Sequence, residues 1–124
     1  MTKLQVNYKT GGGNVVVKFS SGVLISQWLA QLVVPGGAKK KFEGKNTDPI
    51  PDQVAFTPAE LPTGAELDWW EVVFAPAGPE VDYKVTVSIE QGGQKLCDPI
   101  VRDGKLGGHK ATVEKGEIVF TGVA

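Results

Sequence analysis

The feature that most constrains this chain is a strict alternation of apolar and polar residues that recurs along it. The alternation is clearest at 81–91. The residues expected on the buried face there are Val81, Tyr83, Val85, Val87 and Ile89. A period of two indicates a strand with one buried face. The chain also has 17 Val, 5 Ile and 8 Thr against 8 Leu and 1 Met, a bias that favours strands over helices.

Similar runs, separated by glycine and proline, predict the remaining strands. The other expected strands are 3–9, 14–20, 67–75, 94–101 (broken by Pro99), 110–115 and 117–123. We expect three hairpins, which turn at Gly11–Gly13, Gly92–Gly93 and Gly116, because glycine suits tight turns. The pattern predicts an all-β protein, an antiparallel β-sandwich of about eight strands that forms a single domain over residues 1–124.

Two segments are harder to interpret. Residues 23–34 fit the spacing of an amphipathic helix, but we favour a strand there because the surrounding pattern is β. A short helix over 23–34 is the alternative. Residues 39–64 carry four prolines and are expected to be an irregular connection, with short strand pairing around 53–57.

Composition excludes several classes of function. The chain has 13 basic and 14 acidic residues, a net charge of -1, which argues against binding to nucleic acid or to anionic membranes. No apolar run approaches the roughly 20 residues that cross a bilayer, so no membrane insertion is expected. The N-terminus lacks the apolar core of a signal peptide, and we expect a cytoplasmic protein, with leaderless export as the alternative.

The adjacent residues Trp69 and Trp70, flanked by Asp68 and Glu71, form the sharpest candidate for a ligand site. Neighbouring strand residues point to opposite faces, so the two indoles cannot share one pocket. An outward tryptophan would stack on a sugar ring while a carboxylate accepts its hydroxyl groups, or it would anchor a protein contact. The competing interpretation is that both rings are covered by the fold.

A basic cluster at Lys39, Lys40 and Lys41, followed by Phe42, is the candidate for binding a phosphate or an acidic partner. We place it in a turn beside the glycines at 36–37. It lacks the spacing of a phosphate-binding loop. A basic turn that keeps a strand edge soluble is the simpler interpretation.

The chain has one cysteine, Cys97, and one histidine, His109. Together they would form the thiol–imidazole catalytic pair of a hydrolase. This function is a remote alternative, because no catalytic motif surrounds either residue. One residue of each type does not make a His/Cys metal site, and no dinucleotide-binding fingerprint is present, so we predict no metal and no cofactor.

The sequence therefore predicts a non-enzymatic interaction module that binds another protein or itself. The contact would be made through a sheet face or through 39–64, and the apolar residues on both faces of 67–75 motivate this prediction. The alternative is a carbohydrate-binding module that uses an exposed tryptophan.

Overall fold

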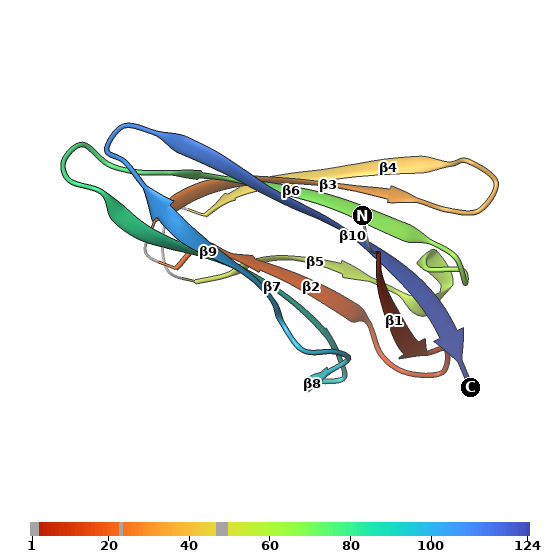
Figure 1. Cartoon of the computed structure of the whole chain (residues 1–124). Coiled ribbons are helices and arrows are strands. Elements are labelled where there is room, and N and C mark those ends of the chain that lie inside the picture. The colour runs from red at the N-terminus through yellow and green to blue at the C-terminus, as the bar shows by residue number, and fades with distance from the viewer. Residues whose placement is uncertain (1–2, 23, 47–49) are drawn as a thin grey trace.

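Two β-sheets pack face to face in this protein, shown as a computed structural model in Figure 1. The structure describes residues 3–22, 24–46 and 50–124. Sheet A has the strand order β1-β10-β6-β3-β4. Its strands are β1 (Leu4–Lys9), β3 (Ile25–Val33), β4 (Lys39–Asn46), β6 (Glu66–Phe74) and β10 (Ala111–Val123). The β1–β10 pair is parallel and the other pairs of this sheet are antiparallel.

Sheet B has β7 at its centre, with β2 and then β5 on one side and both β8 and β9 on the other. Its strands are β2 (Val15–Ser20), β5 (Asp52–Phe56), β7 (Val81–Gln91), β8 (Gln94–Lys95) and β9 (Ile100–Leu106). A single turn of 3-10 helix, η1 (Pro58–Glu60), follows β5. The predicted β-sandwich is confirmed, with ten strands among the described residues instead of about eight.

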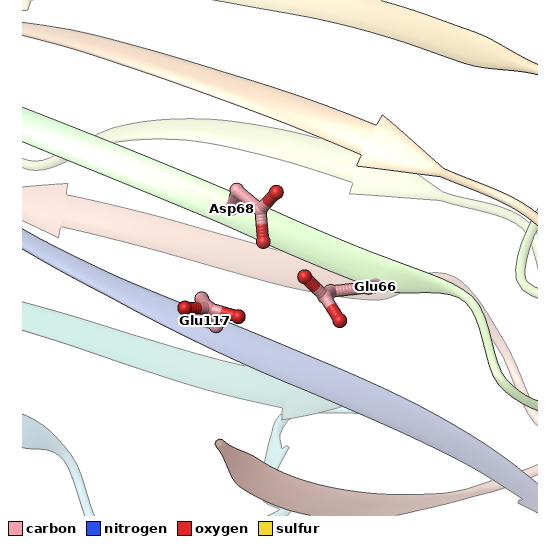
Figure 2. A group of neighbouring side chains, drawn as sticks. All are labelled: Glu66, Asp68 and Glu117. Atoms are coloured by element: carbon pink, nitrogen blue, oxygen red, sulfur yellow. The ribbon is translucent and has the colours of Figure 1, made fainter. Parts of the chain in front are cut away.

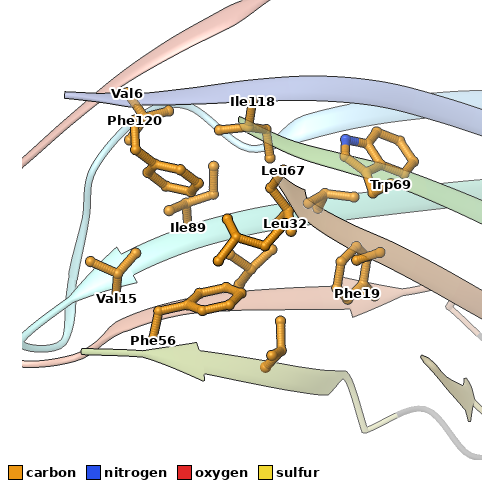
Figure 3. Close-up of a cluster of buried hydrophobic side chains, with 14 of the residues drawn as sticks. Val6, Val15, Phe19, Leu32, Phe56, Leu67, Trp69, Ile89, Ile118 and Phe120 are labelled. Atoms are coloured by element: carbon orange, nitrogen blue, oxygen red, sulfur yellow. The ribbon is translucent and has the colours of Figure 1, made fainter. Parts of the chain in front are cut away.

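The core lies between the sheets and consists of the inward residues of each alternating strand (Figure 3). The predicted buried face of β7 is correct, since Val85, Val87 and Ile89 are fully buried. From sheet A, Leu67 and Trp69 of β6 point into the same layer. Burial of this kind contributes about 25 cal/mol for each Å² of apolar surface removed from water.

The predicted hairpin between 3–9 and 14–20 is wrong. Both segments are strands, but β1 joins β10 in sheet A whereas β2 pairs with β5 and β7 in sheet B. The Gln91 side chain supports this crossover. Its Oε1 accepts from the amide of Lys9 at 2.8 Å, and its Nε2 donates to the carbonyls of Lys9 and Gly13. Alternation fixes which face of a strand is buried, but it does not choose the neighbouring strand.

The predicted turn at Gly116 is also wrong, because residues 111–123 form one continuous strand, β10. Gly116 lies directly opposite Trp69 of β6. A Cβ atom at Gly116 would lie 2.7 Å from the indole Nε1, so glycine is needed there for close approach and not for a turn. In contrast, Gly92 and Gly93 have positive φ and close the β7–β8 hairpin as expected.

The two ambiguous segments are resolved as strands. The favoured strand over 23–34 is confirmed as β3, although residue 23 lies outside the described residues. The expectation of an irregular connection over 39–64 is wrong in part, because 39–46 forms β4 at the edge of sheet A. The short pairing expected around 53–57 is confirmed by β5. No helix within the described residues is long and apolar enough to cross a bilayer.

Candidate functional site

The two adjacent tryptophans point to opposite faces of sheet A, as the alternation of β6 requires. Trp69 is fully buried in the core, whereas Trp70 lies half-buried on the outer face. Asp68 shares the outer face with Trp70, and Glu71 shares the inner face with Trp69. Of the four residues singled out from the sequence, Trp70 and Asp68 are therefore the two that a ligand at the surface of sheet A would meet.

Glu71 is a carboxyl group inside the sandwich, with none of its surface exposed. Its strand neighbours are Trp28 on β3 and Glu114 on β10. Neither carboxyl oxygen of Glu71 has a hydrogen-bond partner among the described residues. Burial raises the pKa of Glu71 to about 7, and the nearby hydroxyl of Ser26 opposes the shift only in part. The position explains why this acid contributes nothing to a surface site.

The outer face of sheet A carries an apolar patch that runs across three strands. We define the patch by six residues: Ile25, Leu29, Trp70, Val72, Phe74 and Val113. The register places them in adjoining rows, because Ile25 pairs with Phe74, Leu29 with Trp70 and Val72 with Val113. Ile25 and Val113 are 54% and 51% exposed. A contiguous apolar surface of this kind is typical of an interaction site.

Two depressions lie on this face, one over the patch and one beside it. One has a volume of about 650 Å³ and lies over β4, β3 and β6, with Gln27, Leu29, Lys45 and Trp70 among its lining residues. The other, about 200 Å³, lies over Gly116. Its lining residues are Asp68, Trp69, Trp70, Lys115, Gly116 and Glu117. The smaller depression therefore combines an aromatic surface with charged groups of both signs.

Three carboxylates gather on the outer face next to the patch. Figure 2 shows Glu66 and Asp68 on β6 and Glu117 on the neighbouring β10. One carboxylate oxygen from each lies within 4.8 Å of the others. Burial and the adjacent carboxylate of Glu66 raise the pKa of Asp68 to about 6. Sequence reasoning missed this group, since Glu117 meets the other two only through the β6–β10 register.

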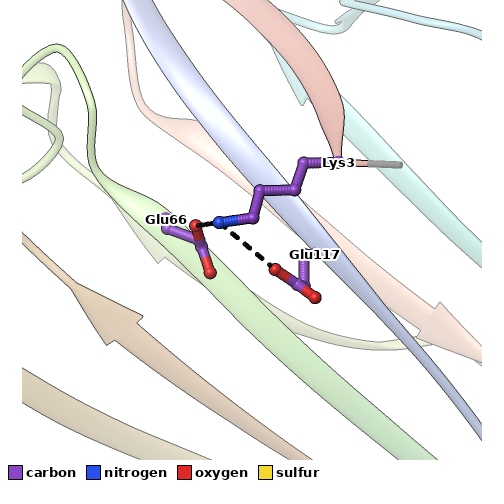
Figure 4. Close-up of polar contacts among 3 residues, drawn as sticks. All are labelled: Lys3, Glu66 and Glu117. Atoms are coloured by element: carbon purple, nitrogen blue, oxygen red, sulfur yellow. Dashed lines mark hydrogen bonds and ion pairs between the residues drawn. The ribbon is translucent and has the colours of Figure 1, made fainter. Parts of the chain in front are cut away.

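The ammonium group of Lys3 lies within reach of two of these acids (Figure 4). Its Nζ lies 2.8 Å from Glu66 and 3.6 Å from Glu117. The interaction of Glu66 with Asp68, followed by that with Lys3, lowers the pKa of Glu66. Because Lys3 supplies the compensating charge, we interpret the three acids as part of a surface ion network and not as a metal centre.

The basic cluster lies on the edge strand β4 and not in a turn, which corrects the sequence-based placement. Alternation divides it between two faces. Lys39 and Lys41 are on the outer face of sheet A, whereas Phe42 points inward. The Phe42 ring packs edge-on against the Phe56 ring, with 5.3 Å between the ring centroids. Lys40 lies over the ring of Phe42. Lys41 lies in the same row across the sheet as Asp68 and Glu117, and Lys39 lies in the row of Glu66, so the lysines and the acids flank the same end of the patch.

Cys97 and His109 show no sign of acting together. Cys97 is partly buried against the core, and burial together with Asp98 raises the pKa of its thiol. A nucleophilic cysteine needs the opposite shift. His109 occupies a turn with a positive φ of 61°. No hydrogen bond links the two side chains within the part of the chain that the structure describes.

A further cavity, about 750 Å³, is an open groove between β9 and the first half of β10. It exists because β1 pairs only with residues 118–123 of β10 and leaves the preceding edge uncovered. Ile100, Val101 and Val113 are among its lining residues. Its position separates it from the centre of the apolar patch, which lies on β3 and β6.

No protein-family model matches the chain, and neither the curated proteins nor the solved structures include a significant match to it.

Proposed function

We propose that this protein is a non-enzymatic module that binds protein through the outer face of sheet A. The observation that carries the proposal is the apolar patch, which three neighbouring strands expose on a rigid sheet. Trp70 lies within it, and tryptophan is enriched where protein contacts are strongest. The patch is bordered by lysines on β4 and by acids on β6 and β10, the arrangement of an apolar centre with a polar rim.

The test compares two matched substitutions on opposite sheets. Ile25→Glu places a charge in the patch, whereas Val101→Glu places one on β9 of sheet B, at a residue of comparable exposure (54% and 43%). In pull-downs from lysates of the cells in which the protein naturally occurs, a partner should be retained by the wild type and by Val101→Glu and lost with Ile25→Glu. The retained protein should also slow hydrogen exchange in β3, β6 and β10. Equal capture by all three proteins would contradict the proposal.

A second candidate function is sugar binding at the smaller depression. The supporting observation is that Asp68 and Trp70 line it together, so a ring stacked on the indole would have a carboxylate within the same depression. Trp70→Ala should then abolish binding on a glycan array while the fold persists, and Ile25→Ala, at the far end of the patch, should leave it intact. Absence of binding by the wild-type protein removes this candidate.

A further inference from the structure

We propose that the outer face of sheet A binds a second copy of this chain, across a two-fold axis that runs parallel to the strands between β3 and β6. This inference rests on the protein-binding function proposed above and identifies the partner. It is drawn from the order of residues across the face, which the strand register of sheet A fixes.

Two adjacent rows across the sheet carry opposite charges at their two ends. Each row runs over β4, β3, β6 and β10 in that order. The first row is Glu43, Leu29, Trp70 and Lys115. The second row is Lys41, Gln31, Asp68 and Glu117. The sign of the charge at the β4 end is therefore reversed between the rows, and so is the sign at the β10 end.

A two-fold rotation about the proposed axis matches these charges. It places β4 of one copy over β10 of the other and keeps each row in register. Glu43 then faces Lys115 of the second copy, and Lys41 faces Glu117 of the second copy. Symmetry repeats both contacts, as in any isologous interface. The long side chains of Lys and Glu span the offset that arises because stacked sheets cross at about 30°.

The same rotation joins apolar groups at the centre. It places β3 of one copy over β6 of the other, so that Leu29 faces Trp70 of the second copy and Ile25 faces Phe74. The rotation stacks four strands of each copy, β4, β3, β6 and β10, which at about 4.8 Å apart and about 30 Å long provide on the order of 600 Å² for each copy. Stable interfaces bury about 600–1,000 Å² for each partner, so the four strands reach the lower end of that range.

Other two-fold axes fit the face less well. An axis along β6 would place Leu29 against Lys115 of the second copy. An axis perpendicular to the strands, through the row of Leu29, would place Lys41 against Lys45 of the second copy. Neither arrangement brings opposite charges together. The proposed axis does so at Glu43 with Lys115 and at Lys41 with Glu117, although it also places Lys45 against Val113 of the second copy.

The charges that would pair between copies have few alternatives within one chain. Glu43, Lys41 and Lys115 form no ion pair with any side chain in the described ranges. Strands β3 and β6 separate β4 from β10, so Glu43 and Lys115 lie about 14 Å apart across the sheet. Glu117 is the exception, since it lies 3.6 Å from Lys3.

The experiment is a charge exchange followed by light scattering on a size-exclusion column over a hundred-fold range of concentration. The wild type should elute as a dimer at high concentration. Glu43→Lys and Lys115→Glu should each raise the dissociation constant at least about ten-fold, because each places like charges together at two symmetric positions. The double variant, Glu43→Lys with Lys115→Glu, should recover most of the affinity of the wild type.

Lys84→Glu, an exposed lysine on β7 of sheet B, is the control and should not change the dissociation constant. A monomeric wild type at every concentration would overturn the proposal. So would a dimer whose affinity the double variant does not recover, because another surface would then be in contact. The protein-binding function fails separately, when Ile25→Glu and Val101→Glu retain the same partners as the wild type.

Discussion

The indole of Trp69 lies against the backbone of Gly116 on the neighbouring strand. The relationship recurs, since an aromatic residue on the inner side of a strand faces a glycine directly opposite it at three further places. These pairs are Tyr8 with Gly122, Trp28 with Gly44, and Tyr83 with Gly104. In each pair a Cβ on the glycine would lie 3.0 Å or less from the ring or its hydroxyl. The large rings cover glycines that would otherwise leave gaps in the strands.

The first prediction concerns this close approach. Gly116→Ala should destabilise the protein by about 1–3 kcal/mol, because the added methyl group overlaps an indole that is itself fully buried. Urea unfolding of the two proteins measures the difference. Gly11→Ala is the control and should be close to neutral, since nothing lies within 4 Å of its Cβ position. Equal stability of Gly116→Ala and the wild type would show that the indole relaxes freely.

The buried carboxyl of Glu71 should make stability fall as pH rises. Its folded pKa of about 7 exceeds the ordinary value of 4.5, so the native state holds the proton more tightly than the unfolded chain. The resulting stabilisation is complete below pH 4.5 and is lost as pH rises through 7. A difference of this size corresponds to about 3 kcal/mol.

Urea unfolding of the wild type and of Glu71→Gln between pH 4 and 8 tests this prediction. The amide does not titrate, so the stability of Glu71→Gln should fall much less over the interval. Glu80→Gln changes an exposed acid outside sheet A and should keep the wild-type pH dependence. Parallel curves for the wild type and Glu71→Gln would contradict the assignment.

A further prediction concerns the crossover between the sheets. Gln91→Leu should cost about 3 kcal/mol in urea unfolding, because it removes the partner of the Lys9 amide and of the carbonyls of Lys9 and Gly13. Gln94→Leu changes an exposed residue of the same hairpin and should cost little. If the free energy of unfolding falls by the same amount in both variants, the three hydrogen bonds of Gln91 do not stabilise the crossover.

The three tryptophans should differ in their access to solvent. Trp28 and Trp69 are 5% and 0% exposed, whereas Trp70 is half-buried on the outer face. In dilute protein, Trp70→Phe should therefore remove most of the fluorescence that acrylamide quenches. Quenching that survives in Trp70→Phe and disappears in Trp28→Phe would place the accessible indole on β3 and would contradict the prediction.

Local alternation was enough to predict several strands and their buried faces. At 81–91 the period of two marks the inward side of the strand, because the direction of a strand side chain depends only on its own backbone. Val85, Val87 and Ile89 are buried there, whereas Val81 and Tyr83 are only partly buried. The opposite faces of Trp69 and Trp70 follow from the same rule. The glycine at 116 misled the sequence interpretation, because glycine marks both turns and close contacts and the sequence does not distinguish them.

The candidate site depended on information that the sequence does not carry locally. The sequence by itself determined that Trp70 and Asp68 share one face of a strand, because they are two positions apart and side chains two positions apart point to the same side. Only the tertiary structure decided that β3 and β10 lie on either side of β6 and so complete the patch with Leu29 and Val113. The physical reason is that strand pairing joins backbones far apart in the chain, and the hydrogen bonds that make it are nearly the same for any sequence.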